Sequence, residues 1–314
     1  MSYPTLPLVV ITGLTSTGKS DIALKLSQKI NGEIIISDSR QIYKYFDIGT
    51  AKPTIEEQKV TPHHLIDICE PTETYTVAQY QKEAENAINN IINKNKIPML
   101  VGGTGLYIKA VIDKFNIPKA PPDEKIRKKL KYIASQQGAL YLYEELKKID
   151  LQAANKIHPN DTFRIIRALE VYYITGQPIS ALWHKELSSP YKLFYIGINT
   201  SKEILIERIA LRIENMIQCG LIDEVKWLVQ RYSYSLPLLY TLNYREICEY
   251  LKEKISLSDA KNLMVKNTKK YAKQQRTWFK ADERIIWWEI IDYANINCII
   301  DKIYAWLKHS LYGK

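Results

Sequence analysis

The segment GLTSTGKS, residues 13–20, constrains the fold of this chain more than any other feature. It matches the pattern G-x-x-x-x-G-K-[ST], in which backbone N–H groups converge on phosphate oxygens at the start of a helix. An apolar run at 8–12 precedes the segment, and helical spacing at 21–30 follows it. Because the motif works only between a buried strand and a helix, this context predicts a genuine phosphate-binding loop.

Strand and helix patterns alternate through the first hundred residues. Apolar runs at 8–12, 33–37 and 97–101 predict buried strands, while 21–30 and 75–94 have helical spacing. Such alternation is typical of a parallel sheet with helices on both faces. We therefore predict an α/β fold whose core is a P-loop NTPase-like parallel sheet flanked by helices.

The pattern changes after the third of these strands. A proline-rich, turn-like stretch at 117–125 is followed only by helical patterns, until strand character returns at 191–199. Beyond that strand the chain looks mainly helical. The simplest account is one catalytic core, residues 1–115 and 191–314, with a helical C-terminal part and a helical insertion domain at 116–190.

Composition limits the possible partners. Lys and Arg outnumber Asp and Glu by 44 to 34, and the resulting net charge of +10 over 314 residues favours a polyanionic partner without requiring one. The four cysteines are widely spaced and form no CxxC pair, which argues against disulfides and zinc. Neither a signal peptide nor a membrane span is indicated. We expect a soluble, cytoplasmic protein with no membrane partner.

The loop alone does not identify the phosphate compound. Most P-loop proteins bind nucleoside triphosphates and place an acid at the end of a neighbouring strand to organise Mg²⁺. Here the strand at 97–101 ends in Gly-Gly-Thr, and Asp67 is only a weak candidate for that acid. Asp38 directly follows the strand at 33–37, at the edge where open α/β sheets bind ligands. Its carboxylate could be a general base or Mg²⁺ organiser, or could simply cap a turn.

Residues 261–280 carry seven basic side chains and no acidic one. Five of them recur at steps of three and four and so share one helix face: Lys266, Lys269, Lys273, Arg276 and Lys280. Met264, Tyr271 and Trp278 are expected on the opposite, apolar face. A second basic cluster lies at 125–131, where the insertion begins. Basic faces suit RNA phosphates, although most charge runs are merely solvated.

The stretch DSRQIYKYFDIGTAKPT (38–54) closely resembles the signature that follows the second strand of tRNA dimethylallyltransferases, also called tRNA isopentenyltransferases. Further matches follow in order: PHHLID (62–67), LVGGTGLY (100–107), RIIRALEVYYITGQPIS (164–180), GLIDEV (220–225) and YAKQQRTWF (271–279). They cover most of the chain and are long and idiosyncratic, so chance agreement is implausible.

The resemblance implies transfer of a dimethylallyl group from dimethylallyl diphosphate to N6 of the adenosine 3′-adjacent to the anticodon in tRNA. Asp38 would be the general base, with Thr104 and Lys19 also catalytic and the Ser20 hydroxyl holding Mg²⁺. The diphosphate would be bound by Gly13, Thr15, Ser16, Thr17, Gly18, Lys19 and Ser20, and Arg208 and Arg212, four apart on a predicted helix, could reach it from the other side. For the two arginines, an exposed basic helix face is the equally open alternative.

The tRNA contacts are implied for fifteen positions in this sequence: Asp38, Ser39, Arg40, Gln41, Thr104, Arg127, Phe163, Arg164, Arg167, Asn243, Tyr244, Arg245, Lys269, Lys273 and Arg276. Three residues depart from the family pattern. Asn243 stands where glycine is usual, and Lys269 and Gln274 stand where arginines are usual. Lysine keeps the charge of arginine but loses its planar fork, and glutamine loses the charge. Affinity or selectivity for tRNA is therefore expected to differ from that of typical members.

Other interpretations carry less weight. The adjacent His63 and His64 are expected to pack rather than bind a metal, and His158 is expected to be a turn element. An adenylate isopentenyltransferase would not need the helical insertion and the basic stretch. A P-loop kinase of a small metabolite would consume ATP without tRNA. A non-catalytic RNA-binding protein would have no reason to keep both the P-loop and Asp38. We expect a monomer.

Overall fold

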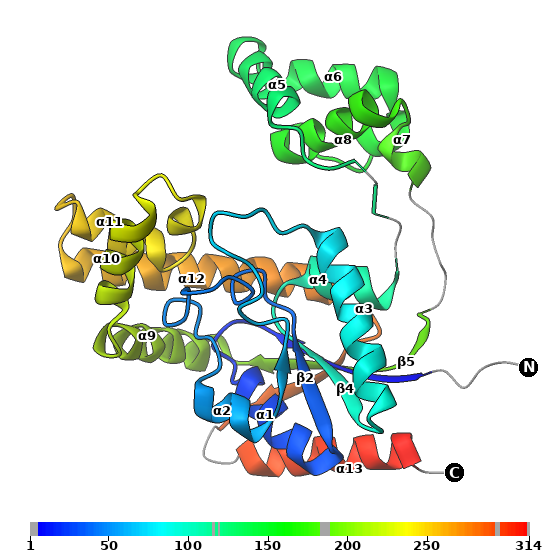
Figure 1. Cartoon of the computed structure of the whole chain (residues 1–314), viewed down its shortest axis with the longest axis vertical. Coiled ribbons are helices and arrows are strands. Elements are labelled where there is room, and N and C mark those ends of the chain that lie inside the picture. Colours follow the sequence, from blue (N-terminus) through cyan, green and yellow to red (C-terminus); the bar gives the residue numbers. More distant parts are fainter. Residues whose placement is uncertain (1–5, 115–116, 119, 183–188, 293–295, 313–314) are drawn as a thin grey trace, which may run out of the picture. The chain divides into compact units, whose positions relative to one another are not determined.

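The structure is a computed structural model of the 314-residue chain, and it describes all residues except 1–5, 115–116, 119, 183–188, 293–295 and 313–314. The chain folds into two compact units, drawn in Figure 1. The first comprises Met1–Ile112 and Ser189–Lys314, and the second is Asp113–Ser188. No described helix has the length and apolarity that crossing a membrane requires.

The first unit is built on one six-stranded sheet with the strand order β3-β2-β4-β1-β5-β6. The strands are β1 (Leu6–Gly13), β2 (Gly32–Ile36), β3 (His63–His64), β4 (Ile97–Val101), β5 (Tyr191–Thr200) and β6 (Ile286–Ile290). All neighbouring strands pair in parallel, for example with Val9 opposite Met99. The predicted parallel α/β fold is confirmed.

Alternate residues of β1 face opposite layers of helices, as the period of two in a strand requires. Leu8 and Val10 pack with α3 (Val77–Asn93) and α4 (Gly105–Ile112) on one side of the sheet. Val9 and Ile11 pack with α1 (Lys19–Ile30) and α13 (Ile296–Tyr312) on the other. The apolar strand runs are therefore buried on both faces, which is why they show no alternation in the sequence.

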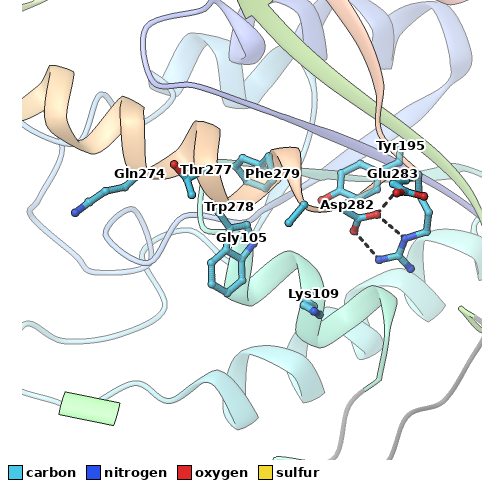
Figure 2. Close-up of a pocket in the computed structure, with 11 residues that line it drawn as sticks. Gly105, Lys109, Tyr195, Gln274, Thr277, Trp278, Phe279, Asp282 and Glu283 are labelled. Carbon is cyan, nitrogen blue, oxygen red and sulfur yellow. Dashed lines mark hydrogen bonds and ion pairs between the residues drawn. The ribbon is translucent and has the colours of Figure 1, made fainter. Parts of the chain in front are cut away.

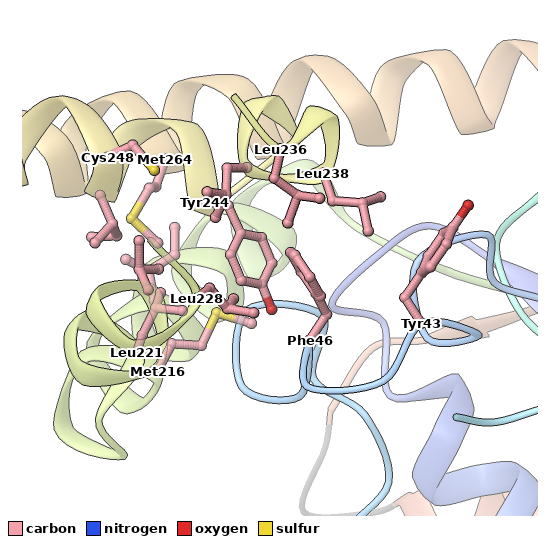
Figure 3. Close-up of a cluster of buried hydrophobic side chains, with 14 of the residues drawn as sticks. Tyr43, Phe46, Met216, Leu221, Leu228, Leu236, Leu238, Tyr244, Cys248 and Met264 are labelled. Carbon is pink, nitrogen blue, oxygen red and sulfur yellow. The ribbon is translucent and has the colours of Figure 1, made fainter. Parts of the chain in front are cut away.

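A third apolar cluster connects further helices to the loop that follows β2 (Figure 3). The helices are α9 (Lys202–Gln218), α10 (Leu221–Tyr232), α11 (Tyr244–Leu251) and α12 (Leu257–Lys280), with the short η2 (Pro237–Tyr240). Phe46 of the loop is buried in this cluster, and its ring lies 4.7 Å from that of Tyr244, centroid to centroid. Another short helix, α2 (Ile55–Val60), follows the loop.

The prediction that the chain is mainly helical beyond residue 201 missed β6. This strand pairs with β5 in parallel, with Ile196 opposite Ile286. Within β6 only Ile290 is fully buried. The tryptophan-rich run is therefore an edge strand whose state is set by its pairing with β5 rather than by a local pattern.

The second unit consists of helices, and no strand is found among its described residues. They are α5 (Glu124–Gln137), α6 (Ala139–Ile149), α7 (Leu151–Ala154), α8 (Thr162–Thr175) and η1 (Ile179–Leu182). They enclose their own apolar cluster, which includes Leu142, Leu146 and Leu169. Between α7 and α8 the ring Nδ1 of His158 accepts a hydrogen bond from the Asn160 N–H at 3.1 Å, as a turn element would.

Candidate active site

The phosphate-binding loop lies between β1 and α1, where the sequence predicts it. Gly13 approaches β5 so closely that a Cβ atom would lie 2.3 Å from the Ile198 carbonyl oxygen. Gly18 precedes α1 with a φ of 80°, a left-handed conformation that glycine adopts without strain. The Thr17 hydroxyl donates to the Leu14 carbonyl at 2.8 Å. The two glycines thus shape the turn, and the threonine closes it.

Two arginines of α9 contact this loop, although α9 lies far from it in the sequence. Arg208 Nε donates to the Ser16 carbonyl at 2.9 Å. Arg212 Nη1 lies 3.5 Å from Thr15 Oγ1, and its Nη2 lies 3.5 Å from the Thr50 carbonyl oxygen. The structure therefore brings both arginines to the P-loop, and neither lies on an exposed basic helix face.

Positive charge is concentrated at the loop. Burial, together with the charge of Arg212, lowers the pKa of Lys19 to about 8, and the charge of Asp38 opposes this shift. Burial also lowers the pKa of Arg212, Arg208 adds to this effect, and Asp38 again opposes it. Three cations therefore surround the loop, with the carboxylates of Asp38 and Asp21 nearby. An anion bound here would relieve their mutual repulsion.

Asp38 and Thr104 are brought together by the ends of β2 and β4. Thr104 Oγ1 accepts a hydrogen bond from the Ser39 N–H at 3.0 Å, and the Thr104 N–H donates to the Ser37 carbonyl at 3.1 Å. A Cβ atom on Gly102 would lie 2.0 Å from that carbonyl oxygen, so only glycine allows this approach. Asp38 Oδ1 accepts from the Arg40 N–H at 2.9 Å. One carboxylate oxygen thus caps a turn.

A cavity of about 750 Å³ collects most of the predicted donor-site residues. Those that line it are Thr15, Ser16, Gly18, Lys19, Ser20, Asp38, Arg208 and Arg212, and Gln41, predicted as a tRNA contact, lines it as well. Gly13, Thr17 and Thr104 are not among the lining residues. The Ser16 hydroxyl is buried and has no hydrogen-bond partner among the residues that the structure describes. The cavity therefore combines cations, backbone and hydroxyl groups that suit a phosphate.

Gln275 is a site residue that the sequence analysis missed. It is buried on α12, where its Oε1 accepts from the Thr15 N–H at 2.8 Å and its Nε2 donates to the Gly103 carbonyl at 3.1 Å. It thus joins the P-loop to the segment before Thr104. A polar residue in register with the buried line Ala260, Met264, Thr268 and Ala272 was the available signal.

The predicted apolar face of α12 needs correction. Met264 is buried, but Trp278 is 41% exposed. Residues seven apart drift by about 20° per heptad on a straight helix, so the buried line moves to Gln275 and Phe279 instead. The indole of Trp278 lies over Gly105, where a Cβ atom would come within 2.0 Å of its Nε1.

Trp278 borders a second cavity of about 740 Å³, at the end of α12 (Figure 2). Lys109, Asp282 and Arg284 also line it, and Arg284 Nε donates to Asp282 Oδ1 at 2.8 Å. This cavity shares no lining residue with the P-loop cavity and contains none of the predicted donor-site residues.

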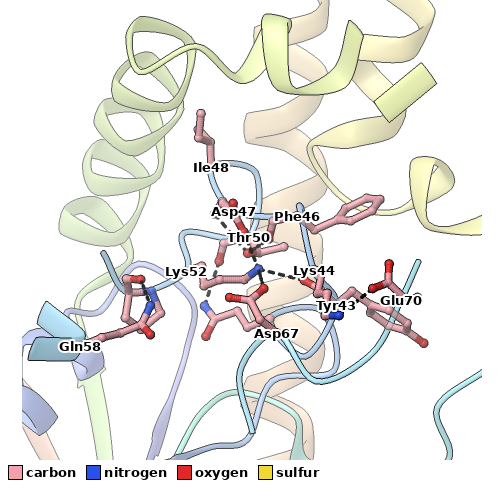
Figure 4. Close-up of polar contacts among 12 residues, drawn as sticks. Tyr43, Lys44, Phe46, Asp47, Ile48, Thr50, Lys52, Gln58, Asp67 and Glu70 are labelled. Carbon is pink, nitrogen blue, oxygen red and sulfur yellow. Dashed lines mark hydrogen bonds and ion pairs between the residues drawn. The ribbon is translucent and has the colours of Figure 1, made fainter. Parts of the chain in front are cut away.

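A buried lysine anchors the loop beside the P-loop cavity (Figure 4). Only 4% of the Lys52 side chain is exposed. Its Nζ pairs with Asp47, lies 2.6 Å from Asp67 Oδ1 and donates to the Tyr43 carbonyl at 2.8 Å. Asp67 therefore serves as an anchor for this loop, although it also lines the cavity.

The basic residues of α12 are mostly available to a partner. Lys266, Lys269, Lys273 and Lys280 are exposed. Arg276 is half-buried, and its Nη2 lies 3.4 Å from Asn199 Oδ1. The predicted basic face therefore exists, although Arg276, its one arginine, is partly engaged by Asn199 of the core.

Asn243 and Tyr244 are in the core, so the structure argues against the RNA contacts expected of their side chains. Tyr244 is 1% exposed, and its hydroxyl donates to Glu224 Oε1 at 2.7 Å. Asn243 is 8% exposed, and its Nδ2 donates to the Gly49 carbonyl at 2.8 Å. Arg245, in contrast, is exposed. The ring of Tyr244 packs in the apolar cluster that includes residues of α10 and α11, where it is more stable than in water. The local sequence could not indicate this packing, because it joins distant segments.

Gln41 is likewise turned inward. It is 9% exposed, and its Nε2 donates to the carbonyls of Thr50 and Ala51, both at 3.1 Å. Ser39 is half-buried and Arg40 is exposed. Of these three neighbours, Arg40 offers the most surface to a large partner.

In the second unit, two arginines predicted to contact RNA pair instead with a buried carboxylate of the same unit. Arg127 Nε and Arg167 Nη1 lie 2.8 and 2.5 Å from the carboxylate of Glu170, which is fully buried. Phe163 is 76% exposed, and Arg164 is also exposed. The arginines at 127 and 167 therefore stabilise this unit, whereas Phe163 and Arg164 present surface to a partner.

The neighbouring histidines have structural partners. His64 Nε2 lies 2.7 Å from Glu33 Oε2, and His63 Nδ1 lies 2.7 Å from the Thr61 carbonyl oxygen. Burial alone would raise the pKa of Glu33, but hydrogen bonds from Lys96, His64 and Lys94 lower it to about 2. Among the described residues no three His, Cys, Asp or Glu side chains could hold a metal together.

Comparison with known proteins gives a consistent result. The model of the IPP transferase family (IPPT) matches residues 41–282. A tRNA dimethylallyltransferase from Gloeothece citriformis (strain PCC 7424) is 48% identical over 297 residues, which cover 95% of this chain and 94% of that protein. One from Moorella thermoacetica (strain ATCC 39073 / JCM 9320) is 46% identical over 291 residues, 90% of each chain.

Solved structures agree. The full-length tRNA isopentenylpyrophosphate transferase from Bacillus halodurans has 38% sequence identity and a TM-score of 0.72, covering 97% of this chain and 96% of that one. A eukaryotic dimethylallyltransferase acting on tRNA has 29% identity and a TM-score of 0.82, covering 95% of this chain and 78% of that one. The similarity therefore extends over nearly the whole chain rather than the P-loop region alone.

Proposed function

Because the chain belongs to the IPP transferase family, we propose that it transfers a dimethylallyl group from dimethylallyl diphosphate to N6 of the adenosine 3′-adjacent to the anticodon in tRNA. Membership makes the chain a tRNA-modifying transferase. The donor, the alkylated atom and the roles of individual residues are the proposal. We further propose that the reaction takes place in the cytoplasm.

The observation that carries the proposal is the group of Lys19, Arg208 and Arg212 around a P-loop that shares its cavity with Asp38. When the C–O bond of the prenyl donor breaks, negative charge grows on the departing diphosphate. Cations and loop N–H groups stabilise charge where it develops, and a fixed arrangement of this kind is usually the largest contribution to catalysis.

The cavity fits a magnesium ion held in part by the donor. Ser20 lines the cavity next to Lys19 and offers one hydroxyl ligand. Mg²⁺ commonly takes one or two protein ligands and completes its shell with phosphate oxygens and water. When bound, it would add positive charge at the diphosphate.

Asp38 is the group suited to take the proton from the acceptor. The exocyclic amine of adenine is a poor nucleophile because its lone pair is delocalised into the ring. As its nitrogen forms a bond to the prenyl carbon, the proton passes to the Asp38 carboxylate and diphosphate leaves. A positioned base contributes about 10²–10⁴-fold to such a step. Thr104 is held beside Asp38 through the Ser39 N–H.

Exposed basic side chains supply the surface for tRNA. In the first unit these are Arg40, Arg245, Lys269 and Lys273, with Arg276 at the margin. Phe163 and Arg164 of the second unit can stack on bases or pair with phosphates. The target base must leave its stack, which costs only a few kcal/mol in a loop. We propose that the protein acts as a monomer.

Label transfer tests the proposal directly. The protein is incubated with labelled dimethylallyl diphosphate and unmodified tRNA, AMP or ATP alone. We expect label in tRNA. Label in AMP would indicate an adenylate isopentenyltransferase, and ATP consumption without label transfer would indicate a kinase.

Donor affinity is expected to depend on the protonation of Lys19. Because the pKa of Lys19 in the free protein is lowered to about 8, the side chain is charged below that pH and loses its charge above it. The dissociation constant of the donor should therefore be flat up to pH 8 and then rise by up to about tenfold per pH unit. Titration calorimetry between pH 7 and 10 measures this dependence.

The matched variant is Lys19→Arg, which keeps its charge throughout this range. Its affinity for the donor should show no break near pH 8. The same break in the variant and the natural protein would show that another group is responsible.

A further inference from the structure

The segment Asp47–Thr50 passes along the donor cavity while being held from outside it. Asp47, Ile48 and Thr50 line the cavity, and Lys52 pairs with Asp47, the first residue of the segment (Figure 4). The backbone N–H groups of its first three residues converge on one side chain, that of Glu224.

Glu224 belongs to the first turn of α10 and has all its acceptor sites filled. Its Oε2 accepts from the N–H groups of Ile48 at 2.8 Å and Asp47 at 3.2 Å. Its Oε1 accepts from the Gly49 N–H at 3.3 Å and from the Tyr244 hydroxyl at 2.7 Å. A carboxylate offers about four lone-pair sites, so four donors saturate it. Glu224 itself does not line the donor cavity.

The start of α11 holds the same segment at Gly49. A Cβ atom at Gly49 would lie 2.5 Å from the ring of Tyr244, so only glycine allows the segment to pass. Figure 3 shows the Tyr244 hydroxyl directed toward the loop that carries Phe46. Asn243 donates to the Gly49 carbonyl from a backbone with a φ of 72°, a conformation unusual for any residue but glycine. The segment is therefore held by hydrogen bonds to both its N–H and its C=O groups.

The other side of the segment meets the P-loop. The Thr50 carbonyl oxygen accepts from Gln41 Nε2 at 3.1 Å and lies 3.5 Å from Arg212 Nη2. The same guanidinium reaches Thr15 of the P-loop through Nη1. Arg212, one of the three cations of the donor site, is thus held between the segment and the P-loop.

We propose that Glu224 is a positioning residue for the prenyl diphosphate. By fixing the backbone of Asp47–Thr50 it sets the Thr50 carbonyl, and through it the Arg212 guanidinium, at the P-loop. This inference rests on the proposed function, because it gives Glu224 a role in binding the donor that reaction uses. The role acts on the donor and leaves the tRNA surface untouched.

The test is the change Glu224→Gln, read out as separate kinetic constants for the two substrates. The amide retains one acceptor oxygen but points an NH₂ group at two donors. Loss of hydrogen bonds to a charged group is expected to raise the KM for dimethylallyl diphosphate about tenfold or more. The kcat at saturating donor and the KM for tRNA should stay within about threefold of the natural values.

The matched control is Asp223→Asn, the same chemical change one residue earlier. The Asp223 side chain is 81% exposed and its partner in an ion pair is the neighbouring Lys226, so this variant should behave like the natural protein. Asn243→Gly removes the second hold on the segment while glycine accepts the positive φ, so it should fold and raise the donor KM in the same direction.

The outcomes separate the inference from the proposed function. If the natural protein labels tRNA but Glu224→Gln leaves the donor KM unchanged, the inference is wrong and the function stands. A parallel loss of donor binding, tRNA binding and thermal stability would reduce Glu224 to a structural residue. Should that variant not fold, an unchanged donor KM in Asn243→Gly overturns the inference. Absence of label transfer by the natural protein counts against the function itself.

Discussion

Replacing Asp38 with alanine is expected to slow prenyl transfer to tRNA by about 10²-fold or more while tRNA binding survives. The carboxylate lies at the carboxyl end of β2, in the cavity that holds Lys19 and the two α9 arginines. Its removal takes away the proton acceptor without touching the basic surface. Single-turnover transfer rates and tRNA affinity at fixed salt measure the two effects separately.

The variant Asp38→Asn distinguishes a base from a turn cap. Asp38 Oδ1 accepts a hydrogen bond from the Arg40 N–H at 2.9 Å, and an asparagine oxygen can accept the same bond. An asparagine cannot take the proton. Similar loss in Asp38→Asn and Asp38→Ala therefore supports the base, whereas loss confined to the alanine variant would show that Asp38 matters only for the turn.

The second large effect is expected at Glu170 in the second unit. This carboxylate is fully buried, accepts from the Asp123 N–H at 2.8 Å and pairs with both Arg127 and Arg167. Glu170→Ala would leave two arginines without their partner. Breaking a buried pair in this way costs about 3–5 kcal/mol, enough to unfold a small domain. We expect loss of the thermal unfolding transition of this unit.

The control for Glu170 is Glu144→Ala on α6 of the same unit. Glu144 is exposed and its ion pair is with Lys147 on the same helix, so no measurable change is expected. An equal shift in both variants, or none in either, would contradict a special role for Glu170.

The effect of Glu170 should also depend on pH. Burial alone would raise the pKa of Glu170, but hydrogen bonds from Arg127, Arg167 and the Asp123 N–H lower it overall. A carboxyl group whose pKa is lowered by folding stabilises the fold above its unfolded pKa, about 4.3, and loses this contribution as the pH falls below that value. The difference in stability between the natural protein and Glu170→Ala should therefore shrink in acid.

Local patterns were sufficient for the core of the fold. The apolar runs of β1, β2, β4 and β5 and the helical spacing of α1 and α3 are properties of adjacent residues, so the strand–loop–helix context of the P-loop could be predicted. The family resemblance was carried by long segments such as 38–54, and the comparisons confirm it. Edge strand β6 was not predicted, because only its pairing with β5 makes it a strand.

The contacts between distant residues in the site could not be predicted from the sequence. Gln275 bonds the N–H of Thr15 across 260 positions, and Glu224 binds Ile48 across 176. No periodicity or motif links residues so distant, because their contact depends on how α10 and α12 pack against the loop after β2. For the same reason Tyr244 could be assigned to an RNA surface although it lies in the core.

The sequence by itself thus determined the P-loop, the parallel sheet and the family, because each is written in short stretches whose residues act on their neighbours. The tertiary structure decided which side chains surround the loop: the two α9 arginines, Asp38 beside Thr104, and the Glu224 grip on Asp47–Thr50. Burial and hydrogen bonding between distant segments fix those positions, and neither is encoded in the order of adjacent residues.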